Sequence, residues 1–393
     1  MIMKMINRLQ DYPWGSKHFL QDLLGLEKTG PLAELWMGIH PRGMSQVELK
    51  GRAPLDLKDY IGNDPDAVLG SSVHQNFGNL PYLLKLLAAG EPLSIQAHPS
   101  KGQAEAGFAY ENEQGIPLDG FNRNYKDDNH KPEIICALGD YWAMKGFRSP
   151  LQILSYFSSW CPESLQPLLF SESAEDESLF LKSFFISLMN LKEPQLSELL
   201  TAALSWCALQ EDDACHWVLK LQDKYPGDRG ILAPLYLNTL CLKEGEALYL
   251  PAGELHAYLE GFGVELMANS DNVLRGGLTQ KYMDIGELEK ILRFESADIT
   301  RIVPERSADG TGVYKTDSRE FELVALDCDG SSLSLEAGYP VSILIVVQGG
   351  LTLREAVESV SLSPGESCFL SYSDSPRIIE GSGKAFIARI PLP

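Results

Sequence analysis

One short segment places three polar side chains at alternating positions. In residues 92–99, which read PLSIQAHP, Ser94, Gln96 and His98 are separated by apolar residues. In an extended strand, successive side chains point to opposite faces, so these three would share one face while the apolar ones point to a core. An amide oxygen and an imidazole, both metal-ligand types, would then lie two residues apart. A surface or hydrogen-bonded histidine is the alternative interpretation.

A second segment, NHKPE at residues 129–133, sets charged groups at the start of an apolar strand. Pro132 favours an extended conformation at Lys131, so Lys131 and Glu133 would share a face. Burying Glu133 alone ahead of Ile-Ile-Cys-Ala-Leu is costly, and a metal or another cation would offset that cost. An exposed strand end is the alternative.

Two later segments carry a histidine and an arginine beside turns. Residues 248–258 read LYLPAGELHAY, where a strand ends at Pro-Ala-Gly and His256 follows. Such a histidine either binds a metal inside a small β-barrel or donates to a backbone carbonyl. Residues 269–277 read NSDNVLRGG, and Arg275 there suits bidentate contact with a phosphate or an enediolate. A surface salt bridge with Asp271 or Glu265 is the alternative.

The elements that must position these residues are mostly short strands. Residues 1–148 contain apolar runs such as 83–87 and 133–138, bounded by Gly, Pro or Asp. Helical periodicity replaces this pattern after Ser149 and continues to about residue 224. Strand character returns near residue 242, a helix is expected over 285–294, and residues 310–393 again read as strands. The sequence therefore predicts two β units with helices inserted in the first.

Composition limits the possible partners. The chain has 393 residues, enough for two or three domains, and a net charge of -21, which argues against non-specific binding to nucleic acid or an anionic membrane. A phosphorylated small molecule stays possible, because salt screens a distant negative surface over about 8–10 Å. There is no secretory signal pattern and no membrane-length apolar run. Seven cysteines without a C-x-x-C motif predict reduced thiols and a cytoplasmic location.

The motifs QAHP, HKPE, LPAGELHAY and ELMANSDNVLRGGLT, in this order, closely resemble those of the type I phosphomannose isomerases. The resemblance also includes residues 12–16 and 33–41. It extends over residues 5–150 and 240–285, and it is weak in the helical segment and in the last 80 residues.

This resemblance implies one zinc ion per chain, held by Gln96, His98, Glu133 and His256. An amide oxygen, a carboxylate and two imidazoles suit zinc. A position for water or substrate then requires more than four ligands, which zinc permits.

The resemblance also implies a fold. We expect a mainly β chain with an α-helical insertion, in which a cupin-type jelly-roll catalytic domain is followed by a second C-terminal jelly roll. The expected boundaries are 1–148 and 240–300 for the catalytic domain, 149–239 for the insertion and 301–393 for the C-terminal domain.

The implied reaction is the interconversion of mannose 6-phosphate and fructose 6-phosphate through an enediol-type intermediate. Arg275, Lys131 and zinc are candidates to stabilise its developing negative charge. The proton-transfer base is one of His130, Glu265 and Asp271. The phosphate is expected near Ser94, Lys85 and Lys281. The expected partner is a small sugar phosphate, with no nucleic acid or membrane, and the chain is expected to be a monomer or a weak oligomer.

Three other classes of protein compete with this interpretation. A non-isomerase metal-binding cupin, such as a dioxygenase or a sugar-binding regulator, usually uses two or three histidines with a glutamate on adjacent strands. This chain has a glutamine candidate, Gln96, and only two matched histidines, which disfavours iron–oxygen chemistry. A bifunctional enzyme that also makes nucleotide sugars needs a Gly-rich nucleotide-binding half, which the sequence lacks. A non-catalytic homologue is disfavoured by the intact ligand set and by Arg275.

Overall fold

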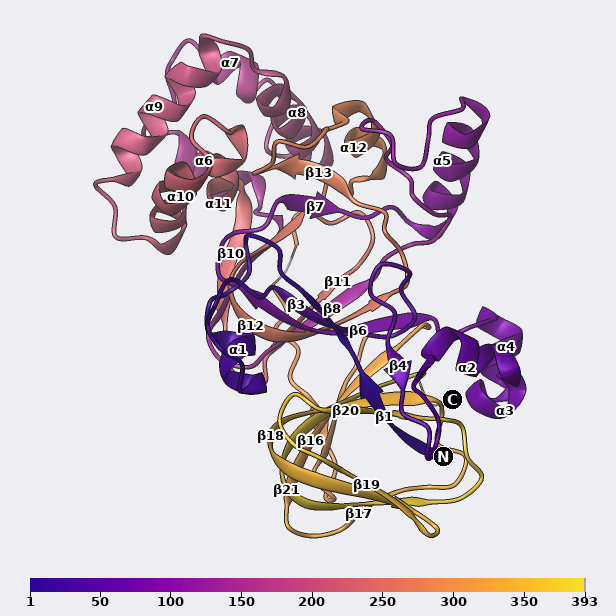
Figure 1. The fold of residues 1–393 in the computed structure, drawn as a ribbon. Coiled ribbons are helices and arrows are strands. Elements are labelled where there is room, and N and C mark those ends of the chain that lie inside the picture. The colour runs from indigo at the N-terminus through magenta and orange to yellow at the C-terminus, as the bar shows by residue number, and fades with distance from the viewer. Residues whose placement is uncertain (298, 392–393) are drawn as a thin grey trace.

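The computed structural model describes residues 1–297 and 299–391. Figure 1 shows two β-rich bodies, an upper one that carries most of the helices and a lower one formed mainly by the yellow C-terminal strands. The helices of the insertion gather at one side of the upper body, and both termini lie beside the lower body.

The upper body is built on one antiparallel sheet around β12. This strand pairs with β6, β7, β8 and β9, so it runs through the centre of the sheet. The strands of this sheet are β2 (Arg8–Gln10), β3 (Glu34–Met37), β6 (Tyr82–Ala89), β7 (Ile95–Ala97), β8 (Glu133–Ala137), β9 (Tyr141–Phe147), β10 (Leu237–Leu242), β11 (Ala247–Leu250), β12 (His256–Ala268) and β13 (Leu274–Gly277).

Hydrophobic runs explain the central strands. Every residue of β6 and of β8 is buried, and among them the charged Lys85 and Glu133 line the cavity while their apolar neighbours pack in the core. In β7, Ile95 and Ala97 are fully buried in the core, whereas Gln96 between them lines a cavity. The alternation expected for this segment is therefore present, and it divides core from cavity.

The lower body is a second antiparallel sheet that also takes in the start of the chain. Its first strand, β1, pairs with β20 on one side and with β4 on the other. The other long pairing joins β18 to β21, with Leu344 opposite Ile387. The strands are β1 (Ile2–Ile6), β4 (Gln46–Val47), β5 (Leu55–Asp56), β14 (Glu305–Arg306), β15 (Thr311–Tyr314), β16 (Glu322–Asp329), β17 (Leu333–Leu335), β18 (Ser342–Glu355), β19 (Glu358–Leu362), β20 (Ser367–Leu370) and β21 (Arg377–Arg389).

The inserted helices have the apolar faces that their periodicity predicts. The first begins at a capping box formed by Ser149 and Gln152, with Pro150 at its first position. The expected stripe Phe180, Leu181, Phe184, Phe185, Leu188 and Met189 is buried in α8. The elements of this segment are α6 (Pro150–Phe157), α7 (Gln166–Leu169), α8 (Glu177–Asn190), α9 (Gln195–Cys207), α10 (Asp213–Lys224), the 3-10 helix η1 (Arg229–Leu232) and α11 (Ala233–Tyr236).

The core of the insertion continues into the strands that carry the candidate site. Ile95 and Ala97 of β7 and Leu274 of β13 belong to the same cluster of buried residues as the helices. The helices therefore support these two strands from behind. The mainly β fold with helices inserted is confirmed, whereas the domain boundaries stay a prediction.

Several helices lie in the first 148 residues, where the pattern predicted only strands and turns. They are α1 (Phe19–Leu24), α2 (Leu57–Asn63), α3 (Pro65–Leu69), α4 (Ser71–Phe77) and α5 (Lys101–Glu113). In α5 only Ala104 and Glu111 are buried, so the helix lacks the apolar stripe that would predict it. A capping box of Ser100 and Gln103 starts it instead.

Helix α12 (Ile285–Ile291) follows β13 and ends three residues before the expected position. Among the described residues, the helices are too short or too polar to cross a membrane.

Candidate metal centre and cavity

An open cavity of about 1300 Å³ lies over the upper sheet. Strand residues form its inner part, and loop residues around 118–126 and 278–282 form its mouth. Lys224 and Tyr225, at the end of α10, also line it. Tyr225 donates a hydrogen bond to the Pro92 carbonyl (2.7 Å), which fixes the insertion to the segment that leads into β7.

Three candidate ligands converge beside this cavity, which Glu133 and His256 line and behind which His98 is fully buried. His98 follows β7, Glu133 starts β8 and His256 starts β12, and one ligand atom from each lies within 4.8 Å of the others. Glu133 Oε1 is 3.5 Å from His98 Nε2, and Glu133 Oε2 is 3.4 Å from His256 Nε2. All three side chains are buried. Gln96 lies opposite His256 in the β7–β12 pair and lines the cavity.

Both imidazoles are oriented by backbone carbonyls behind them. His98 Nδ1 donates to the Asn272 carbonyl (2.7 Å), and His256 Nδ1 donates to the Glu254 carbonyl (3.1 Å). This leaves each Nε2 lone pair directed at the centre. His98 Nε2 is buried without a hydrogen-bond partner among the described residues, as expected of an atom that ligates a metal.

The charge states in the cluster are those of metal ligands. Burial lowers the pKa of His98 to about 4, so its imidazole is neutral at pH 7. Burial tends to raise the pKa of Glu133, but Lys131 and His98 outweigh it and hold that pKa well below its usual range. The Lys131 ammonium lies 2.9 Å from Glu133 Oε1. A carboxylate and two imidazoles fit a divalent cation such as zinc.

A buried row of three charges lies beside this centre. The Lys85 ammonium is 2.8 Å from Glu265 Oε2 and 3.3 Å from Glu34 Oε1. Burial lowers the pKa of Lys85, but Glu265 and Glu34 raise it above its ordinary value, so Lys85 is charged. Burial raises the pKa of Glu265. Trp36 Nε1 donates to Glu34 (3.0 Å) and completes the row.

The cavity mouth carries positive charge. Arg275 of β13 lies opposite Gln96, and Lys281 and Lys126 line the same cavity. Burial lowers the pKa of all three side chains, and Arg275 lowers the pKa of both lysines further. Within the described part of the chain, no carboxylate lies within 4.0 Å of Arg275 or Lys281. Asp271 and Glu265, the alternative partners of Arg275, are paired elsewhere.

Asp271 is held at the cavity wall by two basic side chains. His40 Nε2 lies 3.2 Å from Asp271 Oδ2, and Arg42 bonds the other oxygen. Burial alone would raise the pKa of Asp271, but His40 and Arg42 lower it to about 2. Such a carboxylate is ionised at neutral pH and binds protons weakly.

His130 does not join the other predicted residues. Its Nε2 lies 2.7 Å from Glu320 Oε1, in the C-terminal part of the chain. Among the described residues that line the cavity, His130 is absent, whereas Lys131 is present. Ser94, Lys85, Lys281, Glu265 and Asp271 do line the cavity.

The polar run NSDN forms a hydrogen-bond network beside the metal centre. The Asn272 side chain is fully buried, accepts from Lys126 N (2.6 Å) and donates to the Asp127 and Asn129 carbonyls (both 2.8 Å). The Asp127 carboxylate accepts from Ser270 Oγ (2.8 Å). Because the Asn272 carbonyl also orients His98, this network connects the metal centre to the loop that carries Lys126.

Sequence reasoning missed several side chains that the cavity contains. Glu34, Trp36, His40 and Lys126 line it without having been assigned a role. A signal was available for Glu34 and Trp36, because they alternate in the strand-like run ELWM. Their partner Lys85 is distant in sequence, so the buried row was not visible from either segment alone.

Comparison with known proteins gives consistent results over the whole chain. Residues 2–150 match the family described as phosphomannose isomerase type I, catalytic domain, and residues 311–390 match the mannose-6-phosphate isomerase cupin domain. The mannose-6-phosphate isomerase of Escherichia coli (strain K12) is 38% identical over 99% of both chains. The Homo sapiens mannose-6-phosphate isomerase is 34% identical, over 87% of this chain and 86% of its own.

Solved structures resemble the chain over its full length. A crystal structure of a point variant of the Salmonella typhimurium phosphomannose isomerase has a TM-score of 0.92 and 37% identity. A zinc-bound mannose 6-phosphate isomerase has a TM-score of 0.90 and 37% identity, and each alignment covers 100% of both chains.

Proposed function

The chain belongs to the type I phosphomannose isomerase family, and on that premise we propose that it is a zinc enzyme that interconverts mannose 6-phosphate and fructose 6-phosphate through an enediol-type intermediate. The chemistry requires ring opening, removal of a proton from C2 and delivery of a proton to C1. We assign different residues of the cavity lining to the metal, the proton transfer and the phosphate.

The observation that carries the proposal is the cluster of His98, Glu133 and His256. The buried, unpartnered Nε2 of His98 supports metal binding over a purely structural histidine. Gln96 is the fourth side chain that we assign to the ion. Zinc bound there would act as a Lewis acid towards a substrate oxygen. Lys131, 2.9 Å from Glu133, would place a second positive charge near the same oxygen.

Among the candidate bases, the geometry favours Glu265. It is buried, lines the cavity, and burial raises its pKa, which makes its carboxylate a better proton acceptor than Asp271. His130 is bonded to Glu320 and lies outside the cavity lining. We therefore propose that a Glu265 oxygen accepts the C2 proton, while Lys85 keeps the carboxylate oriented.

The positive mouth supports a substrate orientation with the phosphate outward. Lys281 and Lys126 provide charge there that no nearby carboxylate among the described residues neutralises. Arg275 lies opposite Gln96, and we assign it to the charge that develops during proton transfer. Lys85 is already shared by two buried carboxylates, which offset its charge and make it a weaker phosphate partner than Lys281. We keep Ser94 and Lys281 as phosphate residues and assign Lys85 to Glu265.

The test combines an assay with isotope labelling. Purified chain should convert mannose 6-phosphate to fructose 6-phosphate in a coupled assay, and product formed in deuterium oxide should carry deuterium at C1. Glu265→Gln should lower turnover by about 10²–10⁴-fold while zinc content stays unchanged. Complete transfer of the C2 hydrogen to C1, together with wild-type turnover in Glu265→Gln, would contradict an enediol formed by proton transfer through Glu265. Metal binding without isomerisation would instead favour a non-isomerase cupin.

The cellular setting is part of the same proposal. All seven cysteines are free thiols, which fits a reducing compartment such as the cytoplasm. A monomer or a weak oligomer is the expected state, and sedimentation at micromolar concentration tests it.

A further inference from the structure

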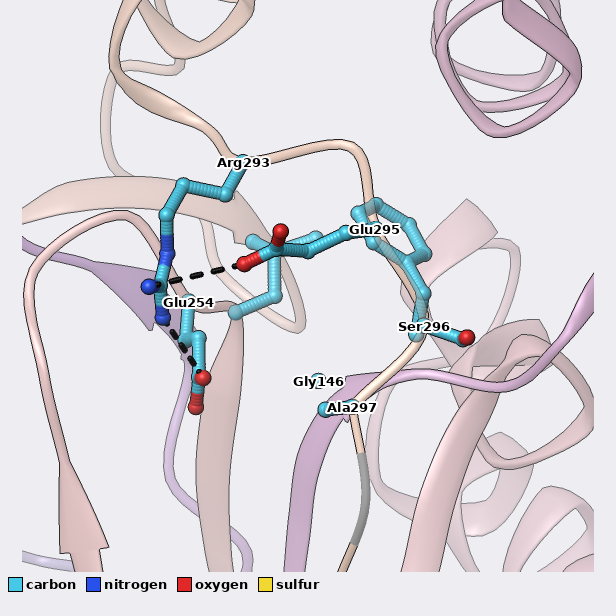
Figure 2. A pocket seen from close by; sticks show the side chains of 8 residues that line it. Gly146, Glu254, Arg293, Glu295, Ser296 and Ala297 are labelled. Atoms are coloured by element: carbon cyan, nitrogen blue, oxygen red, sulfur yellow. Dashed lines mark hydrogen bonds and ion pairs between the residues drawn. The ribbon is translucent and has the colours of Figure 1, made fainter. Parts of the chain in front are cut away.

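The turn between β11 and β12 lies behind the metal centre and has its own buried charge. Its residue Glu254 does not line the large cavity but lines a second cavity of about 200 Å³. Figure 2 shows the Arg293 guanidinium reaching down to the Glu254 carboxylate in this second cavity.

The backbone of this turn contacts both histidine ligands. The Glu254 carbonyl accepts the hydrogen bond from His256 Nδ1 (3.1 Å), and Gly253 N donates to the His98 carbonyl (2.9 Å). A shift of the turn would therefore rotate one imidazole and move the segment that carries the other.

The side chain of Glu254 fixes the turn from outside. Arg293 Nη2 lies 2.7 Å from Glu254 Oε1, and Lys145 Nζ lies 3.4 Å from Oε2. Glu254 and Lys145 are only 14% and 11% exposed, so water screens this interaction less than it screens a surface ion pair. Lys145 is also the residue opposite His256 in the β9–β12 pair.

The backbone of Arg293 holds the same turn. Arg293 N donates to the Gly253 carbonyl (3.0 Å). Gly253 has φ +82°, and a Cβ there would lie 2.9 Å from Arg293 Cγ and 3.0 Å from the Ile291 carbonyl oxygen. The segment after α12 is thus packed directly onto the glycine, which leaves the turn a single position.

We propose that Glu254 is a positioning residue for the metal centre. Its carboxylate, held between Arg293 and Lys145, fixes the carbonyl that orients His256 and the amide that supports His98. This inference rests on the proposed zinc site, and it adds a group that touches neither metal nor substrate. Loss of the carboxylate should loosen both histidines and shorten the lifetime of the bound ion.

The experiment compares metal release from variants of the full chain. Zinc transfer to a chromogenic chelator should be about 10–100-fold faster for Glu254→Ala than for wild type. Glu254→Gln should fall between them, because its amide oxygen still accepts from Arg293. Arg293→Ala should release zinc faster than wild type but more slowly than Glu254→Ala, because Lys145 still pairs with the carboxylate. The visible spectrum of the cobalt-substituted protein should shift in Glu254→Ala if the ligand geometry changes.

A matched control removes an ion pair of similar length far from the site. Glu380 pairs with Arg354 at 2.8 Å, with both side chains about half exposed, and Glu380→Ala should release zinc at the wild-type rate. A wild-type release rate and cobalt spectrum in Glu254→Ala would overturn the positioning role. If wild type itself fails to bind stoichiometric zinc, the proposed function is wrong instead. Should Glu254→Ala fail to fold, Glu254→Gln and Arg293→Ala decide the question by the same two measurements.

Discussion

The two β-rich bodies fill the space beside their sheets in opposite ways. In the C-terminal body, Leu344, Val346, Leu353 and Ile387 are 0% exposed and belong to one apolar cluster. In the upper body, the strand faces towards the cavity carry buried polar and charged groups instead, such as Lys85, Glu133, His256 and Glu265. Burying such groups costs free energy unless they are paired or bind an ion. Similar sheets therefore serve as a stable core in one body and as a chemical site in the other.

The largest effect is expected from removing a metal ligand in the upper body. His98→Ala should lose zinc and lower turnover by at least about a thousandfold, because the metal supplies several kcal/mol of charge stabilisation. Zinc content by elemental analysis and turnover in the coupled assay measure both effects. Treating wild type with a chelator and then restoring zinc is the control. Full activity in metal-free protein would contradict the proposed metal role.

The next largest effect is expected at Arg275, which faces the cavity without a partner carboxylate among the described residues. Arg275→Ala should lower turnover by roughly a hundredfold or more, with zinc content and folding near normal. Arg275→Lys should recover part of the loss, because it keeps the charge but loses the planar fork. Steady-state kinetics separate the possibilities. A change in KM alone would make Arg275 a phosphate anchor that acts equally in ground and transition states.

Truncating a core side chain in the lower body should lower stability and leave the metal site unaffected. Leu344→Ala should lower the free energy of unfolding by about 2–5 kcal/mol, because it leaves a cavity in a packed core. Zinc affinity and turnover per folded molecule should stay at wild-type values. Denaturant unfolding and kinetics on the same preparation check this. Altered zinc affinity in Leu344→Ala would show that the two bodies are coupled.

The His130–Glu320 pair joins the two bodies and should make the stability of the protein depend on pH. Burial opposes it, but the His130 hydrogen bond lowers the pKa of Glu320 to about 2, from an ordinary value of 4.5. A depressed carboxyl pKa adds stability above pH 4.5, and this stability is lost as the pH falls towards 2.

Glu320→Gln should therefore flatten the fall in stability below pH 4.5. Between pH 5 and pH 3, wild type should lose about 1–2 kcal/mol more than the variant, after allowance for solvent screening. Unfolding curves at both pH values provide the measurement. Parallel pH profiles would mean that the pair contributes nothing in solution.

The smallest effect concerns the charge at the mouth. The KM for mannose 6-phosphate should rise a few-fold between about 50 and 500 mM salt, because screening weakens attraction between a phosphate and exposed lysines. Lys281→Gln should reduce this salt dependence. A KM independent of ionic strength would argue against a charge-based phosphate site.

The parts of this molecule that local pattern determines could be predicted from the sequence. The buried run in β6 and the apolar stripe of α8 both follow from periodicity. The segments carrying His98, Glu133 and His256 were found by motif, and they converge in space.

The remainder depends on partners far apart in the chain. Nothing near Lys85 indicates that Glu34 and Glu265 will enclose it, and nothing near His130 indicates Glu320. The helices α1 to α5 were missed for two reasons. α1 to α4 have only five to seven residues, too few to show a period, and α5 begins at a capping box but has no apolar stripe.

The pairing of β1 with β20 has a consequence for how the chain assembles during synthesis. Ile2 lies opposite Leu370, so β1 can pair with this neighbour only after the intervening segments, which include the strands of the upper body, have been synthesised. Until then β1 has only the short strand β4 beside it, and one edge remains open to other chains. Such non-local pairing slows folding. During synthesis the lower body therefore keeps an unpaired strand edge until its last partner strand is made.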